Sequence, residues 1–149
     1  MTDLDALSDV TVEQDPDGET RSAVLDNLRR FNRQRAEPPD FKPITVAARH
    51  KGELIGGLVG ETGWRWLFVE LLWVEERFRS QGVGTRLLHL AETEAVRRGA
   101  LHAYLDTFDF QAKPFYERAG YLVFGTLEDY PPGHARYFMQ KNLGNGVGQ

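Results

Sequence analysis

The first half of the chain places its apolar residues at two different periods. Between residues 19 and 35 they recur every three to four positions, which predicts an amphipathic helix that Pro38 and Pro39 end. Runs of strand-forming residues separated by turns then predict consecutive antiparallel strands at 44–49, 54–59 and 66–74. The last of these is apolar on both faces except for Glu70, which is typical of a buried central strand. Residues 10–12 are a candidate for one short strand before the helix.

The second half of the chain alternates helices with strands. The pattern predicts helices at 83–98 and 112–119 and strands at 101–107, 121–127 and 135–140. A strand–helix–strand connection makes 66–74 and 101–107 parallel neighbours. We therefore predict an α+β (mixed α/β) fold in three layers, with a mostly antiparallel central sheet of about seven strands.

Composition limits the classes of protein to which the chain can belong. Its 149 residues are enough for one domain, so we expect a single domain over 1–149 with loose termini at 1–9 and 144–149. The absence of cysteine excludes disulfides, thiolate zinc sites and cysteine nucleophiles, and no histidine spacing suggests a metal. A net charge of −4 argues against binding nucleic acid or an anionic membrane. With no signal peptide and no membrane-spanning run, we expect a cytoplasmic protein.

The segment with the clearest chemistry runs from Arg79 to Thr85, between a strong strand and a strong helix. Its two glycines let backbone N–H groups crowd together, and the helix start adds partial positive charge, which together favour a phosphate. A P-loop is excluded because Gly84 is followed by Thr85 and Arg86 rather than by lysine. A dinucleotide fingerprint is excluded because Leu87 stands where a small residue is required.

Two motifs in this sequence resemble those of one known family. Arg79-x-x-Gly82-x-Gly84 matches every fixed position of Q/R-x-x-G-x-G/A, the pyrophosphate motif of the GCN5-related N-acetyltransferase (GNAT) superfamily. The segment 112–121, with Tyr116 at its centre, is similar to a second motif of that family. The resemblance covers residues 10–143 and implies a GNAT-like fold. In that fold, strands 66–74 and 101–107 splay apart and acetyl-CoA fills the gap.

The resemblance also implies a set of residues for binding acetyl-CoA. Backbone amides of the segment after Arg79 would hold the diphosphate, and the backbone N–H of Leu72 would polarise the thioester carbonyl. Asp109 stands where the family often has an asparagine that bonds the pantetheine arm, and a carboxylate cannot donate in that way. The cofactor-binding candidates are Leu72, Trp73, Val74, Arg79, Ser80, Gln81, Gly82, Val83, Gly84, Thr85, Asp109 and Tyr116.

Two side chains are candidates for the acid–base chemistry. Tyr116 occupies the position of a family tyrosine that protonates the departing thiolate, although the residue could instead only pack or position the sulfur. Glu70 is a candidate general base for the amine, or else a solvated or salt-bridged strand residue. His134 is a weaker candidate for a base or a substrate ligand. Several acidic residues could also gather near one mouth and attract a cationic amine: Glu70, Asp106, Asp109, Glu128 and Asp129.

The function predicted from these residues is an N-acetyltransferase. It would move an acetyl group from acetyl-CoA to a primary amine of a small molecule or peptide by direct attack, so that no protein nucleophile is needed. A non-catalytic acyl-CoA-binding module on the same fold is the main alternative, and transfer to an alcohol is another. A homodimer is compatible with the family, whereas no metal, nucleic acid or membrane partner is expected.

Overall fold

The computed structural model describes residues 9–144, which belong to two compact units, Met1–Pro38 and Pro39–Gln149. The first unit holds α1 (Glu19–Arg33), close to the predicted helix, and α1 buries none of its side chains. The strand predicted at 10–12 was wrong, because these residues form no regular structure. A strand needs a partner for its backbone, and the described part of that unit contains no other strand. The termini expected to be loose lie almost wholly outside the described residues.

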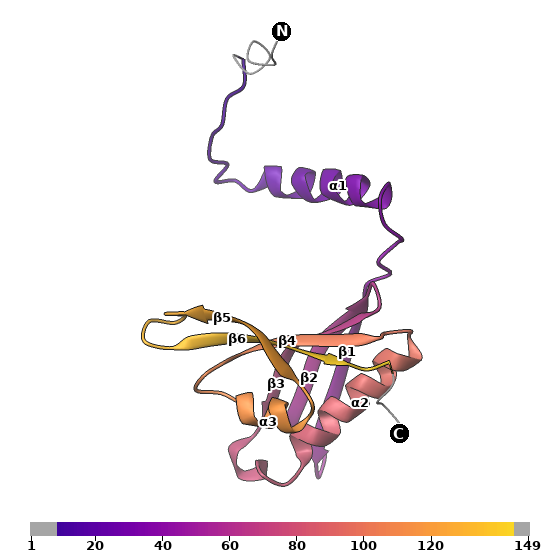
Figure 1. Cartoon of the computed structure of the whole chain (residues 1–149), viewed down its shortest axis with the longest axis vertical. Helices are drawn as coiled ribbons and strands as arrows, with labels where there is room; N and C mark the ends of the chain where they lie inside the picture. The colour runs from indigo at the N-terminus through magenta and orange to yellow at the C-terminus, as the bar shows by residue number, and fades with distance from the viewer. Residues whose placement is uncertain (1–8, 145–149) are drawn as a thin grey trace. The chain divides into compact units, whose positions relative to one another are not determined.

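The second unit is built on one mixed sheet of six strands in the order β1-β2-β3-β4-β6-β5 (Figure 1). All neighbouring strands are antiparallel except β3 and β4, which are parallel because α2 connects them. The α+β class and the parallel pair are confirmed, with six strands instead of about seven. The strands are β1 (Lys42–His50), β2 (Glu53–Gly63), β3 (Trp66–Val74), β4 (His102–Phe108), β5 (Leu122–Glu128) and β6 (Ala135–Asn142).

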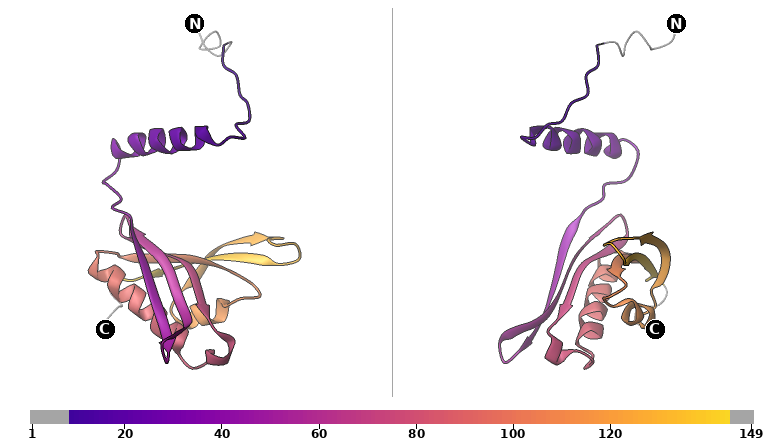
Figure 2. Two further views of the ribbon diagram at one scale, coloured as in Figure 1. Left: turned by 180° about the vertical axis from the view of Figure 1, so that it is seen from behind. Right: turned by 90° about the vertical axis from the view of Figure 1, so that its left-hand side faces the viewer.

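Two helices cover one face of this sheet. Buried side chains of α2 (Val83–Arg97), among them Leu87 and Leu88, share one apolar cluster with Tyr116 of α3 (Lys113–Arg118). The same cluster takes in strand residues of β1, β2, β3, β4 and β6. Figure 2 shows both helices on one face of the sheet. A short 3₁₀ turn, η2 (Glu76–Phe78), links β3 to the loop before α2. Among residues 9–144, none of the helices combines the length and the apolarity that a bilayer crossing demands.

A β-bulge interrupts the middle of β3. Val59 pairs with Leu71 but the next residue of β2, Gly60, pairs with Val69, so Glu70 is an extra residue on β3. Gly60 makes the bulge possible, because a Cβ there would lie 2.2 Å from the Phe68 carbonyl oxygen. A side chain at position 60 would therefore collide with the backbone of β3.

The bulge reverses which side chains of β3 face the helices. Before it, Leu67 is fully buried. After it, Leu72 and Val74 pack against the core, while Leu71 and Trp73 are exposed. Without the extra residue, the strand alternation would have pointed Leu71 and Trp73 into the core instead.

The parallel pairing between β3 and β4 stops at the same level. The ladder runs from Trp66 opposite His102 to Val69 opposite Leu105, and no later residue of β3 has a partner on β4. Beyond that point β4 stays paired with β6 as far as Phe108. The sheet therefore opens into a V-shaped seam between β3 and β4 at the bulge.

Candidate active site

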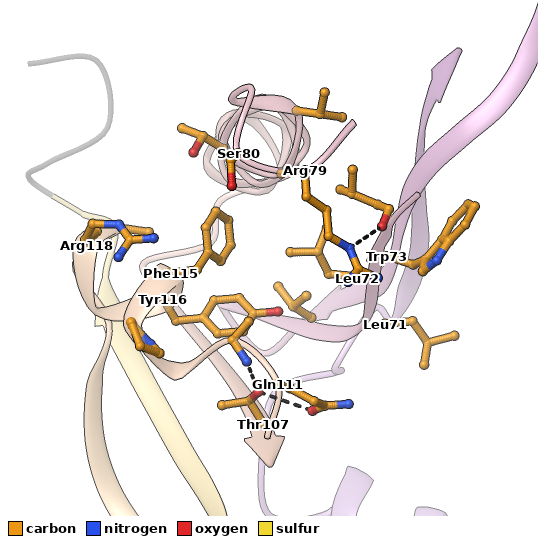
Figure 3. Close-up of a pocket in the computed structure, with 18 of the residues that line it drawn as sticks. Leu71, Leu72, Trp73, Arg79, Ser80, Thr107, Gln111, Phe115, Tyr116 and Arg118 are labelled. Atoms are coloured by element: carbon orange, nitrogen blue, oxygen red, sulfur yellow. Dashed lines mark hydrogen bonds between the residues drawn. The ribbon is translucent and has the colours of Figure 1, made fainter. Parts of the chain in front are cut away.

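A cavity of about 1040 Å³ occupies the open seam (Figure 3). Its walls come from the second half of β3, the loop that begins α2, the end of β4, and α3. These segments are far apart in sequence and meet here because the bulge separates the two central strands. All of them belong to the second unit.

The loop before α2 presents a row of unused backbone donors. The N–H groups of residues 80–85 donate no hydrogen bond within the described part of the chain. Those of residues 83–85 belong to the first turn of α2, where an α-helix leaves its donors unpaired and carries partial positive charge. Ser80 and Gly82 adopt left-handed backbone conformations, with φ of 63° and 82°, and so fold the loop tightly. The loop is suited to bind an anion.

Close packing fixes this loop against the rest of the site. A Cβ on Gly84 would lie 3.3 Å from the Phe115 ring, so a side chain at this position would require the ring to shift by a few tenths of an ångström. From the other side, Arg79 Nε donates to the Val74 carbonyl oxygen at 2.9 Å (Figure 3). The loop is thus attached both to α3 and to the end of β3.

Tyr116 points from α3 into the cavity (Figure 3) and is only 6% exposed. Its ring packs edge-on against Phe115, with centroids 5.1 Å apart, and against Tyr121 at 5.9 Å. Burial, and then the negative charge of Asp106, raise the pKa of Tyr116 to about 12. The phenol is therefore protonated at neutral pH.

A small polar network sets the start of α3. Gln111 Oε1 accepts hydrogen bonds from Thr107 Oγ1 at 3.2 Å and from the Phe108 N–H at 2.9 Å. Thr107 Oγ1 in turn accepts from the Ala112 N–H at 3.4 Å. The network orients the helix that carries Tyr116. Sequence reasoning missed it, although a threonine inside an apolar strand, followed four residues later by glutamine, was a usable signal.

Two carboxylates lie at the fork of the seam, which is the point where β3 and β4 separate. Glu70, at the bulge, is exposed and lines the cavity. Asp106 also lines it and is held by Arg136, whose Nε donates to Asp106 Oδ1 at 2.9 Å. Asp109, Glu128 and Asp129 do not line the cavity. Of the five acidic residues expected near one mouth, the structure therefore brings together only these two.

Ten of the twelve predicted cofactor-binding residues line the cavity; Gln81 and Asp109 do not. The Gln81 side chain turns back and donates from Nε2 to the Arg77 carbonyl oxygen at 3.0 Å. Phe110, Phe115 and Arg118 also line the cavity and were not predicted. Phe115 fell inside the second motif, but nothing in the sequence said which way its side chain would point.

Asp109 instead joins two loops. Its Oδ1 lies 2.8 Å from His134 Nδ1, and its Oδ2 accepts from the Ala135 N–H at 2.9 Å. Burial alone would raise the pKa of Asp109, but these two hydrogen bonds, together with the charge of His134 and the Phe110 backbone N–H, outweigh that effect and lower it. His134 is likewise absent from the cavity lining and packs edge-on against Phe110 at 4.9 Å. Within residues 9–144, no cluster of acidic and histidine side chains could hold a metal ion.

Comparison with known proteins agrees with this fold and cavity. Residues 4–121 match the model of the acetyltransferase (GNAT) family. A blasticidin-S acetyltransferase of Streptomyces morookaense is 42% identical over 124 residues, which are 83% of this chain and 90% of that protein. An acetyltransferase of Agrobacterium fabrum is 37% identical over 138 residues, 92% of this chain and 97% of that protein. The crystal structure of a Bacillus cereus acetyltransferase superposes with a TM-score of 0.83 at 28% identity, covering 89% of this chain and 97% of that one.

The chain belongs to the GNAT acetyltransferase family. It is an enzyme that transfers an acetyl group. Its acetyl donor is acetyl-CoA, and solved structures with this fold are complexes with acetyl-CoA or CoA. The residues present fit that cofactor. The free N–H groups of residues 80–85 suit its diphosphate, and the unpaired edge of β3 suits its pantetheine arm.

Proposed function

We propose that the protein is an N-acetyltransferase that acetylates a primary amine of a small molecule, with Tyr116 as general acid and Glu70 as general base. The observation that carries this proposal is the open seam. A single cavity is lined by the donor-rich loop, by the proton-donating phenol and by a carboxylate. When bound, acetyl-CoA supplies the thioester whose carbonyl carbon the amine attacks. The loop of residues 80–85 binds the diphosphate through N–H groups that the fold leaves unused.

The backbone of β3 beyond the bulge also offers donors to the seam. The Glu75 N–H points toward β2, because it donates to the Ile55 carbonyl oxygen at 2.7 Å. Backbone groups alternate sides along a strand, and the Val74 carbonyl oxygen accordingly faces away from β2, where it accepts from Arg79. The Leu72 N–H, two residues before Val74, faces the same way. We assign this N–H to the oxygen of the thioester carbonyl.

Tyr116 and Glu70 divide the proton transfers. Glu70 takes one proton from the incoming ammonium, directly or through water, because only the neutral amine is nucleophilic. The Tyr116 hydroxyl gives one proton to the departing sulfur. It is protonated at neutral pH and makes no hydrogen bond to any described residue, so its proton is available to the cavity. As the carbon–sulfur bond breaks and the amide forms, the nitrogen loses its second proton, which restores the Tyr116 phenol, and Glu70 releases the first proton to solvent. The products are the amide, the free CoA thiol and one proton.

A small-molecule amine is the acceptor that the relatives favour. The Streptomyces morookaense protein is named for its action on blasticidin S, so blasticidin S is the first acceptor to test. We also propose that residues 1–149 act as one acetyltransferase domain. We place the enzyme in the cytoplasm, where acetyl-CoA is available.

The deciding experiment is an acceptor screen with acetyl-CoA and a thiol reporter. The panel contains blasticidin S, a polyamine, an aminoglycoside, a lysine peptide and the alcohol analogue of each successful amine. We expect release of free CoA thiol only with an amine present, and a product heavier by one acetyl group. Tight CoA binding in calorimetry without turnover of any amine would support the non-catalytic acyl-CoA-binding module instead. An ester product would indicate transfer to oxygen.

We further propose a homodimer that forms along β5. This edge strand exposes Leu122 and Phe124, which are 73% and 55% accessible, beside unpaired backbone groups. An exposed apolar edge strand favours pairing with another strand. Light scattering should give twice the chain mass, and Phe124→Lys should give the monomer mass. A monomeric wild-type protein would contradict the dimer.

A further inference from the structure

The fork of the seam carries two acidic residues at equivalent positions. Val69 and Leu105 form the last pair of the β3–β4 ladder. The next residue on β3 is Glu70 and the next on β4 is Asp106, and both line the same cavity. Two carboxylates thus lie at the apex of the opening, where the cavity passes between the strands.

The two carboxylates differ in how they are held. Among the described residues, Glu70 has no ion-pair or hydrogen-bond partner for its side chain, and it lies on the bulge. Asp106 is fixed through Oδ1 by Arg136, and both side chains of this pair are mostly buried. The Arg136 guanidinium is itself enclosed by aromatic rings, lying 5.0 Å from the Tyr130 centroid and 5.1 Å from that of Phe138. No described residue holds the Glu70 side chain, whereas Arg136 holds that of Asp106.

Asp106 keeps one oxygen for a ligand. Its Oδ2 accepts no hydrogen bond from any residue that the structure describes. Its charge also reaches the proposed proton donor, because Asp106 contributes to the raised pKa of Tyr116. Asp106 lines the same cavity as Tyr116 and has an unused acceptor atom, so it can bind a ligand there.

We propose that Asp106 binds the ammonium group of the acceptor through its free oxygen, and that Arg136 is the residue that positions Asp106 for this task. This inference rests on the proposed N-acetyltransferase function and gives the two carboxylates different roles. Asp106 holds the cationic amine beside the seam, and Glu70, whose side chain has no described partner, removes its proton. A carboxylate committed to a guanidinium is suited to holding a charge in one place, while an untethered one is suited to taking a proton and releasing it. The class of substrate selected is a primary amine that arrives protonated.

The test separates binding of the amine from catalysis. With the best amine of the screen, Asp106→Asn should raise KM for the amine about tenfold or more, because a charge-assisted hydrogen bond is lost. Its kcat should change much less, and calorimetry should show unchanged affinity for CoA. Glu128→Gln is the matched control, because it removes an acidic charge from β5 outside the cavity. This control should leave KM unchanged.

Arg136 needs a readout that loss of structure alone would not produce. Arg136→Gln should raise KM for the amine in the same direction, and Arg136→Lys should recover part of the loss. The double variant Asp106→Asn/Arg136→Gln should be no worse than Asp106→Asn, because the two residues act through one contact. Thermal unfolding of each variant checks that it folds. Additive losses in the double variant would overturn the role of Arg136.

The outcomes distinguish a failure of the proposed role of Asp106 from a failure of the proposed N-acetyltransferase function. A wild-type enzyme that acetylates the amine, with an Asp106→Asn variant whose KM stays within about twofold, overturns the role of Asp106 alone. A wild-type protein that binds CoA but acetylates no amine overturns both. A rise in KM for the amine with Asp106→Asn, at constant CoA affinity and absent in Glu128→Gln, supports the inference.

Discussion

The β3–β4 pair has a closed half before the bulge and an open half after it, and the two halves have different roles. In the closed half, four residue pairs form a parallel ladder, and aromatic rings stack across it. Trp66 lies 4.6 Å from His102 and Phe68 lies 4.7 Å from Tyr104, centroid to centroid. Backbone pairing and ring contacts together hold the strands at a fixed spacing.

In the open half there is no ladder, and the residues that follow are charged or face a cavity. The change occurs within one residue, at the Glu70 bulge opposite Gly60. The closed half fixes the position of the strands, and the open half uses that fixed position to hold unpaired backbone and carboxylates in place. The extra residue Glu70 therefore marks the point where the paired strands end and the cavity begins.

The largest effect should come from filling the space that permits the bulge. Gly60→Ala places a Cβ 2.2 Å from the Phe68 carbonyl oxygen, so the backbone of β2 or β3 must shift. We expect the free energy of unfolding to fall by about 2–4 kcal/mol in chemical denaturation. Gly125→Ala is the control, since its Cβ would meet nothing closer than 4.0 Å. Equal stability of the two variants would show that Gly60 does not fix the bulge.

Tyr116→Phe tests the phenol on the open side. We expect kcat to fall about a hundredfold, with little change in CoA affinity by calorimetry. Because the pKa of Tyr116 is raised to about 12, its hydroxyl stays protonated at all lower working pH values. The ratio of mutant to wild-type rate should therefore be constant from about pH 6 to about pH 10. Unchanged turnover would remove Tyr116 from the chemistry.

Glu70→Gln should have a smaller effect that depends on pH. Below its pKa, near 10, the acceptor is an ammonium ion that must lose a proton, and above that pH it needs no base. We expect a loss of about tenfold at neutral pH that shrinks as pH rises toward 10, measured as kcat/KM against pH. A profile parallel to that of the wild type would argue against Glu70 as the base.

The smallest effect should come from a hydroxyl just behind Tyr116. Tyr121 is fully buried, and its hydroxyl is the one buried side-chain polar atom in the described residues that lacks a hydrogen-bond partner. Tyr121→Phe should raise the free energy of unfolding by about 1 kcal/mol, because an unpaired polar group leaves the core. It should leave kcat unchanged and thus serve as a matched control for Tyr116→Phe. A loss of stability would mean that the hydroxyl has a partner.

Local pattern predicted most elements of this fold. The strand at 66–74 was placed at its observed bounds, because its composition suits a strand and turn residues precede it. The parallel pair followed from one helical connection. The strand at 10–12 failed because three suitable residues do not form a strand without a partner.

The geometry of the site depended on contacts that local pattern does not contain. The bulge requires Gly60 on a neighbouring strand, so the sequence of β3 alone could not reveal that Leu71 and Trp73 face outward. The orientation of Asp106 is set by Arg136, thirty residues later. Most residues predicted from the first motif do line the cavity, because the backbone of the loop before α2 fixes their positions.

The unpaired backbone N–H groups of residues 80–85 affect how cofactor binding should depend on salt. The protein carries a net charge of −4, and yet it belongs to a family whose acetyl donor is a polyanion. Amide dipoles are neutral groups and release no counterions on binding, unlike a cluster of lysines. The share of the diphosphate affinity that these amides supply should therefore vary little with ionic strength.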